Sequence, residues 1–337
     1  MTSFLESLFN KPKTINIAHE RRNISNLSIG IGAIWFFNQL FQVIVLVLLK
    51  ILFPTYAFSY VSLLLISSVI LYGVAMPLSM VFFKECDVHR VEKRKMDAGL
   101  LIGVIFLNIA LMYVGGVMGS LVDEMTLHLI GESTGNPLGE TVSSIPLWAV
   151  FLIVVVAAPI FEEIIYRRVV IDRLRRYGDG TAIVVSGLVF GLIHGNFNQF
   201  FYATFIGMVL AAVYLCTGRL RITIFMHMSV NFVGSFYTSL MLKKLGGAAP
   251  EEITPEIVEA YPVGCAMMNL LSWIYVAALV LAIPMLIMLI KETRRHLAPA
   301  EVSLRGKQRF QAVFCNLGFW YAAITLVGSF ATNFIFS

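Results

Sequence analysis

Residues 145–168 read IPLWAVFLIVVVAAPIFEEIIYRR, an apolar run that ends in two adjacent carboxylates and two adjacent arginines. Charged side chains are costly in the hydrocarbon of a membrane, so those found there commonly face the interior of a helix bundle and have a function. Taken alone, Glu162, Glu163, Arg167 and Arg168 are explained equally well as the headgroup end of a membrane span. The rest of the chain decides between these two interpretations.

Apolar runs of this kind recur along the chain. Of its 337 residues, 58% are hydrophobic and 13% are charged, against about 25% charged residues in an ordinary soluble domain. Runs of about 18 or more apolar residues indicate transmembrane helices. We therefore predict an all-α fold, a polytopic helical membrane protein with about eight or nine transmembrane helices around a polar intramembrane cavity.

The basic residues alternate with the predicted spans. They crowd the N-terminal tail and the loops after every second span, which by the positive-inside rule places these segments in the cytoplasm. This pattern makes a nucleic-acid partner unexpected despite the net charge of +5. We expect an integral protein of the bacterial plasma membrane with a cytoplasmic N-terminus. The expected spans are 27–53, 59–83, 98–121, 145–174, 181–194, 200–216, 222–242, 267–290 and 312–336.

These spans divide the chain into four predicted parts. Residues 1–26 are a cytoplasmic N-terminal tail, and residues 27–144 are the N-terminal transmembrane helices. Residues 145–242 are a transmembrane core, and residues 243–337 are the C-terminal transmembrane helices. The third span contains Gly115 and Gly119, a GxxxG pair that permits close helix packing. Because that motif is weak, a glycine-rich helix without a specific partner is the favoured interpretation.

Polar residues inside the core recur at helical spacing. Glu163 and Arg167 are four residues apart, so they can pair on one face of a helix. His227 and Asn231 have the same spacing and point the same way. His194 lies on a different span at a depth similar to that of Glu162. The sequence therefore predicts that a carboxylate, two imidazoles and an amide face one cavity.

These groups suit hydrolysis by an activated water. A buried glutamate can act as a general base, and histidine and asparagine can donate to an oxyanion. The chain offers no serine or cysteine with a base at a recognisable spacing. Each group alone has a structural explanation, since an intramembrane histidine or asparagine often only joins helices. Their joint occurrence favours a site.

Three motifs resemble those of one family. Glu162-Glu163-Ile-Ile-Tyr-Arg167, Phe190-Gly-Leu-Ile-His194 and His227-Met-Ser-Val-Asn231 match the EExxxR, FxxxH and HxxxN patterns. The chain is identified by these motifs, between residues 145 and 235, as similar to the CAAX-protease and bacteriocin-processing (CPBP) intramembrane glutamate endopeptidases. The spans on either side match no motif.

The resemblance implies peptide-bond hydrolysis in or near the bilayer. Glu162 would activate water with help from His194, His227 and Asn231 would hold the oxyanion, and Glu163 and Arg167 would support the geometry. Residues 145–242 would then be the catalytic core. No cofactor is expected, although two histidines and a glutamate could bind zinc. The implied partners are the lipid bilayer and a membrane-associated, CAAX-like or bacteriocin-type peptide.

Two other functions stay open at this stage. A transporter could use Glu162, Arg167 and the histidines as an ion or proton relay, although no inverted repeat is visible. A membrane scaffold or immunity partner could keep the pocket for recognition without proteolysis. Replacing Glu162 by glutamine separates these functions, because it should abolish proteolysis, can alter transport and should leave a scaffold intact.

Overall fold

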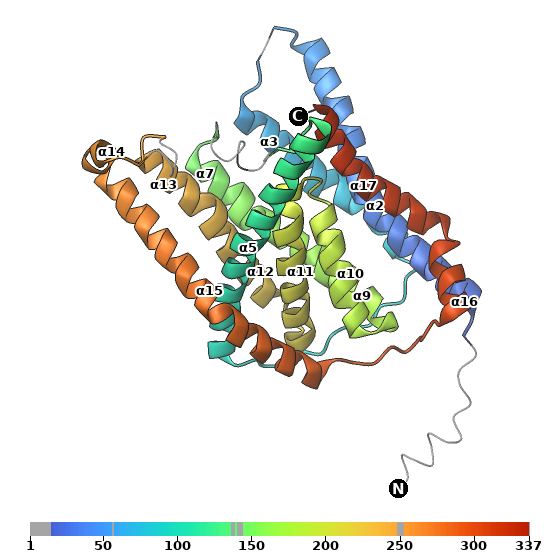
Figure 1. Ribbon diagram of the computed structural model, residues 1–337. Coiled ribbons are helices and arrows are strands. Elements are labelled where there is room, and N and C mark those ends of the chain that lie inside the picture. Colours follow the sequence, from blue (N-terminus) through green and yellow to red (C-terminus); the bar gives the residue numbers. More distant parts are fainter. Residues whose placement is uncertain (1–14, 56, 136–138, 140–143, 248–252, 337) are drawn as a thin grey trace.

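The computed structural model describes residues 15–55, 57–135, 139, 144–247 and 253–336, and every regular element in these ranges is helical (Figure 1). Part of the predicted tail, residues 1–14, lies outside them. The helix that follows begins at Ile17, before the apolar run, because Asn16 caps it by accepting a hydrogen bond from the His19 N–H. An all-helical membrane protein is thus the correct fold class.

All nine predicted spans contain helix. In chain order the elements are α2 (Ile17–Leu52), α3 (Tyr60–Ser68), η1 (Val69–Ala75), α4 (Met76–Phe83), α5 (Ala98–Ile130), α7 (Leu147–Ala149), η2 (Val150–Ala157), α8 (Ala158–Glu163), η3 (Ile164–Ile171), α9 (Asp172–Leu174), η4 (Arg175–Tyr177), α10 (Asp179–Leu192), α11 (Phe197–Thr217), α12 (Leu220–Asn231), η5 (Phe232–Tyr237), α13 (Thr238–Lys244), α14 (Pro255–Ala260), α15 (Pro262–His296), α16 (Gly306–Arg309), η7 (Phe310–Phe314) and α17 (Leu317–Phe336).

The count of spans is lower than the eight or nine that the sequence predicts. In the described residues, 6 helices are long and apolar enough to cross a membrane, or 7 if the pair 306–314 and 317–331, bent by 61°, is one span. Helix α10 has only 14 residues. The stretch α12–η5–α13 carries polar residues throughout, which lowers its hydropathy. Each segment packs against the bundle on one side and leaves large apolar side chains exposed on the other, which are Val184 and Leu188 on α10 and Phe225 on α12.

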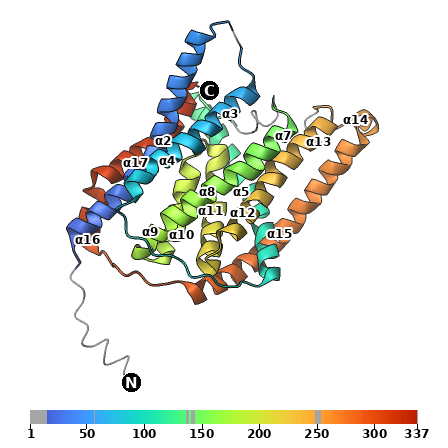
Figure 2. The ribbon, with the colours of Figure 1, turned by 180° about the vertical axis from the view of Figure 1, so that it is seen from behind.

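Helix α11 is the centre of the bundle (Figures 1 and 2). From Val209 to Thr217 each of its residues is buried, because α5, α10 and α15 pack around it. Helices α2 and α17, from the two ends of the chain, lie side by side at one flank. A helix that is apolar all round, like α11, is expected at the core of a membrane bundle.

The glycine pair on α5 has a specific partner, contrary to the interpretation favoured from the sequence. A Cβ on Gly115 would collide with the backbone of Tyr202, and one on Gly119 would collide with the backbone carbonyl of Phe197. Both contacts are with the first part of α11. The GxxxG pair therefore lets the α5 and α11 backbones touch, as small residues do between membrane helices.

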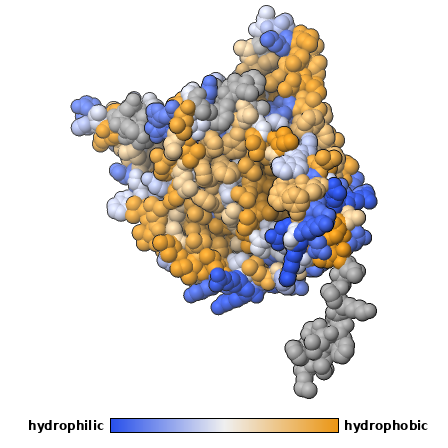
Figure 3. Space-filling model, turned by 45° about the vertical axis from the view of Figure 1, so that its right-hand side comes forward, coloured by the Kyte–Doolittle hydropathy of each residue, from blue (hydrophilic) through white to orange (hydrophobic). Residues whose placement is uncertain are grey.

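The basic segments meet at one end of the molecule. The Arg94 N–H bonds to the Thr217 carbonyl, the His89 N–H bonds to the Asp172 carbonyl, and the Glu301 N–H bonds to the Arg176 carbonyl. Figure 3 shows apolar residues across the middle of one face, with hydrophilic residues along its lower edge and also at its top and upper left. The three bonded segments form what we call the basic end of the molecule.

Candidate active site

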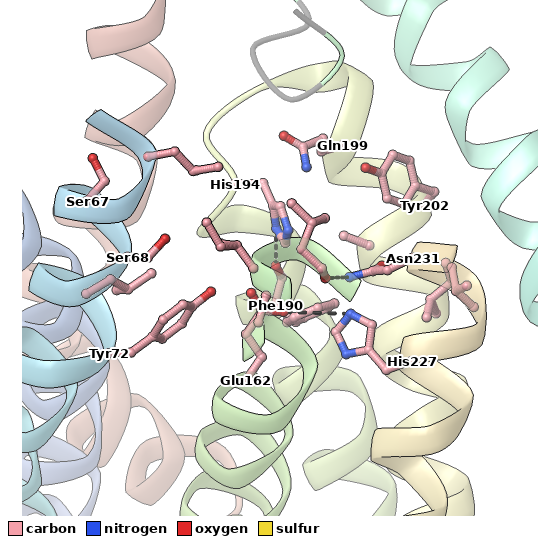
Figure 4. Close-up of a pocket in the computed structure, with 18 of the residues that line it drawn as sticks. Ser67, Ser68, Tyr72, Glu162, Phe190, His194, Gln199, Tyr202, His227 and Asn231 are labelled. Carbon is pink, nitrogen blue, oxygen red and sulfur yellow. Dashed lines mark hydrogen bonds and ion pairs between the residues drawn. The ribbon is translucent and has the colours of Figure 1, made fainter. Parts of the chain in front are cut away.

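The four predicted polar groups face one cavity of about 280 Å³ (Figure 4). Glu162 comes from α8, His227 and Asn231 come from α12, and His194 lies in the turn that follows α10. The Gly195 backbone, at φ 68°, then reverses the chain into α11. Segments separated by more than 60 residues therefore converge as the sequence predicts.

The carboxylate of Glu163 accepts hydrogen bonds from two side chains, those of Arg167 and His227. Arg167 donates to both of its carboxylate oxygens, at 2.9 Å through Nε and 3.2 Å through Nη2. The Nδ1 of His227 donates to Glu163 Oε1 at 3.2 Å. The side chains of Glu163 and Arg167 are 0% exposed. A buried carboxylate in this arrangement is fully paired, so Glu163 orients His227 and is not free to act as a base.

Two further residues complete the support of this ion pair. Ser186 on α10 accepts a hydrogen bond from Arg167 Nη1 at 3.0 Å and donates to the Tyr166 carbonyl at 3.2 Å. The ring of Phe190 lies edge-on to His194 and His227, at centroid distances of 5.2 and 5.6 Å. Phe190 thus sets the distance between the two imidazoles. Ser186 was not predicted, and its small size on an apolar helix gave no signal.

Glu162 differs from its neighbour in its surroundings. Its side chain is 19% exposed, and its Oε2 lies 3.7 Å from His227 Nε2. This distance is longer than a direct hydrogen bond, and no arginine pairs with Glu162 in the described residues. Glu162 therefore has a carboxylate oxygen open to the cavity, whereas Glu163 has none.

The hydrogen bond of His194 fixes its tautomer. Its Nδ1 lies 2.7 Å from the Phe190 carbonyl, and because a carbonyl only accepts, Nδ1 must carry the proton. In the neutral ring, Nε2 then presents a lone pair. His194 lines the cavity at this ring, so it can accept a hydrogen bond from a water molecule there.

Asn231 is anchored through its side chain. Its Nδ2 donates to the backbone carbonyl of Val154 at 2.9 Å. An amide nitrogen has two protons, so one stays available to a ligand. Asn231 borders both the first cavity and a second one of about 670 Å³. The bond to Val154 sets the direction in which the remaining proton points.

The opposite wall of the first cavity comes from helices that the sequence analysis left without a role. Ser67, Ser68 and Tyr72, on α3 and η1, face the site (Figure 4). A third cavity, of about 290 Å³, reaches Glu162 from the side of α2 and contains Asn38 and Gln39. For Asn38 and Gln39 a signal was available, since amides inside an apolar span commonly form hydrogen bonds between helices.

The side chains around the cavity do not fit a metal site. Within the ranges that the structure describes, no three His, Cys, Asp or Glu side chains are grouped so that they could hold a metal ion. Glu163 and His227 Nδ1 already satisfy one another. We therefore derive no step that uses zinc.

Comparison with known proteins agrees with this geometry. The family model for Type II CAAX prenyl endopeptidase Rce1-like matches residues 144–233. A Bacillus subtilis (strain 168) protein described as "Putative membrane peptidase YdiL" is 27% identical over 119 residues, which are 34% of this chain and 47% of that protein. The match thus spans about half the length of that relative. No solved structure matches the chain.

The matched segment contains all three motifs and every residue that the sequence predicted for the site. It begins just before η2 and ends just after Asn231. Segment 144–233 is thus similar to the Rce1-like type II CAAX prenyl endopeptidases, a family of proteases.

Proposed function

We propose that this protein is an intramembrane endopeptidase that hydrolyses a peptide bond of a membrane-associated, CAAX-like or bacteriocin-type peptide with water activated by Glu162. The observation that carries the proposal is the unequal treatment of the two adjacent glutamates. Glu163 is closed off by Arg167 and His227, whereas Glu162 has an open carboxylate in a cavity shared with His194 and Asn231.

The reaction follows from these positions. Glu162 takes a proton from a water molecule that His194 Nε2 also holds, and the resulting hydroxide adds to the carbonyl carbon of the substrate. The oxyanion receives hydrogen bonds from Asn231 Nδ2 and from His227 Nε2, when that nitrogen is protonated. Such donors stabilise a tetrahedral intermediate strongly in a site with little water. Protonated Glu162 then gives its proton to the leaving nitrogen, and the C–N bond breaks.

Glu163 and Arg167 act through His227. The ionised carboxylate accepts from His227 Nδ1 and so turns Nε2 toward the cavity. Removing either partner would leave the other charge buried and unpaired, which is costly. These two residues are therefore positioning residues. Residues 145–242 form the proposed catalytic core, and the basic end of the molecule, with the N-terminus, lies in the cytoplasm of a bacterial cell.

A cleavage assay tests the proposal. The full chain in liposomes is given prenylated and unprenylated CAAX-like peptides and a panel of membrane-derived peptides, and the products are identified by mass spectrometry. Glu162→Gln should abolish cleavage, and Asn231→Ala should lower it about 100-fold or more. The exposed Glu259→Gln carries the same charge change and should cleave normally.

Three results would contradict the proposal. Cleavage that survives Glu162→Gln would exclude Glu162 as the base. Failure of the wild type on every peptide, together with ion flux that depends on Glu162, would indicate a transporter. Bound peptide that co-purifies uncleaved with both wild type and Glu162→Gln would indicate a scaffold.

A further inference from the structure

A separate cavity of about 550 Å³ lies at the basic end of the bundle. Its lining consists of Lys93, Arg168, Gly218, Arg219, Leu220 and Arg221. Four of these six residues are cations, and none is acidic. The cavity shares no lining residue with the three cavities around the candidate active site.

The positive charge in this cavity is only partly balanced. Arg168 has a carboxylate partner, since its Nη1 lies 3.7 Å from the buried Asp172. Among the described residues, no acidic side chain forms an ion pair with Lys93, Arg219 or Arg221. The Nε atom of Arg219 is buried and has no hydrogen-bond partner in that same part of the chain. A buried donor of this kind is costly unless something outside the chain accepts from it.

The cavity also lies where membrane helices end. Gly218 directly follows α11, Leu220 begins α12, and the segment with Lys93 leads into α5. The Arg94 N–H bonds to the Thr217 carbonyl at 2.8 Å, which fixes that segment against the end of α11. Gly218, at φ 58°, allows the same close approach, because a Cβ there would collide with the Glu92 carbonyl. The cations are thus gathered at the level of lipid headgroups.

We propose that this cavity binds a phosphate group, and that its source is the headgroup of an anionic phospholipid. Arginine binds phosphate oxygens with paired N–H donors, and basic pockets at membrane helix ends bind anionic headgroups. The proposal does not depend on the proteolytic function. It adds a lipid site that touches α12, which carries His227, and η3, which follows Glu163.

The test uses the delipidated full chain in neutral detergent and native mass spectrometry. Dioleoylphosphatidylglycerol should bind the wild type, and dioleoylphosphatidylcholine should bind more weakly. Loss of two cations in Arg219→Gln/Arg221→Gln should weaken phosphatidylglycerol binding about 30-fold, at about 1 kcal/mol for each charge. The matched control Lys291→Gln/Arg294→Gln removes two exposed charges from the end of α15 and should bind like the wild type.

Two further measurements identify the source of the phosphate and exclude a loss of folding as the cause of weaker binding. Inorganic phosphate that raises the thermal unfolding temperature as much as the lipid does, and only when Arg219 and Arg221 are present, would assign the site to a free anion and overturn the lipid source. Arg219→Lys/Arg221→Lys keeps the charge and should keep most of the lipid binding. Equal binding of phosphatidylglycerol by the wild type and Arg219→Gln/Arg221→Gln, or no binding by the wild type, would overturn the site.

Discussion

The side-chain amide of Asn231 donates to the backbone carbonyl of Val154, and the reason lies in the helix that Val154 belongs to. In η2, backbone N–H groups bond five residues back, so the Ala158 N–H reaches the Ile153 carbonyl. The next donor in that register would be residue 159, which is a proline without an N–H. Pro159 therefore leaves the Val154 carbonyl to Asn231. π-Helical turns are frequent at functional sites, and here one supplies an acceptor for a side chain.

Restoring the missing donor should release Asn231. In Pro159→Ala the new N–H can bond to the Val154 carbonyl, so we expect the rate of peptide cleavage to fall about tenfold, less than the loss from a removed oxyanion donor. Pro284 lies inside α15, which lines neither the first nor the third cavity, so Pro284→Ala is the control for losing a helical proline. Full activity of Pro159→Ala would show that the Val154 carbonyl does not orient Asn231.

Glu163→Gln should lower the free energy of unfolding as well as the rate of peptide cleavage. The change leaves Arg167, which is 0% exposed, without its counter-charge, and breaking a buried ion pair costs about 3–5 kcal/mol. Thermal unfolding in detergent measures this loss, and Glu259→Gln on exposed α14 is the control. An unchanged unfolding temperature would mean that the pair contributes only to catalysis.

The contact between α5 and α11 gives a comparison within one helix. In Gly119→Ala the new methyl group meets the Phe197 carbonyl, whereas in Gly116→Ala it meets nothing within 4 Å. Overpacking of this kind costs about 1–3 kcal/mol, so we expect a lower unfolding temperature for Gly119→Ala only. Equal effects of the two substitutions would contradict the close backbone contact.

The amides of α2 should affect activity more than stability. Gln42 borders both the first and the third cavity and donates to Asn38 Oδ1 at 3.0 Å. Gln42→Leu removes hydrogen-bonding groups beside Glu162 without removing a buried charge, so we expect cleavage to slow about threefold to tenfold, the value of one hydrogen bond. The exposed Gln311→Leu is the control. A lower unfolding temperature at unchanged activity would assign Gln42 to helix packing.

Lowering the pH should reduce the stability of the fold, because Asp87 at the basic end becomes protonated. The hydrogen bond from His19 lowers the pKa of Asp87, and Asn23 and Arg176 act in the same direction. A lowered folded-state pKa stabilises the fold above the unfolded-state pKa of about 4, and this stability is lost as pH falls through the folded-state value. The unfolding temperatures of the wild type and Asp87→Asn should therefore differ at pH 7 and converge once the pH is below the folded-state pKa of Asp87. A difference that persists in acid would assign the effect to packing.

Local patterns were enough to predict several features. Each of the nine apolar runs contains helix, and the spacing of four residues predicted the ion pair of Glu163 with Arg167 and the shared direction of His227 and Asn231. These features depend on helical periodicity, which the sequence contains directly. The structure has 6 or 7 helices with the length and hydropathy of a membrane span, fewer than the eight or nine that the sequence predicts, because α10 is short and α12–η5–α13 is polar.

Other features depend on contacts between distant segments. The close contact at Gly119 exists only when α5 packs on α11, and the bond from Asn231 to Val154 exists only when α12 packs on η2. No residue pattern in α2 states that Gln42 would lie beside Glu162. The amides in the apolar run of α2 could have indicated a functional helix, but they could not have predicted which residues of the site it contacts.

The walls of the cavity at Glu162 come from two parts of the chain with different relationships to known proteins. The matched segment, 144–233, supplies Glu162, His194 and Asn231, whereas Gln42, Ser67 and Tyr72 come from unmatched helices. A fragment cut to the matched segment would lose these covering helices and expose Glu162 to lipid. In chimaeras between related chains, we therefore expect the proposed cleavage to depend on the middle of the sequence, and the preference for a peptide to depend on the first helices.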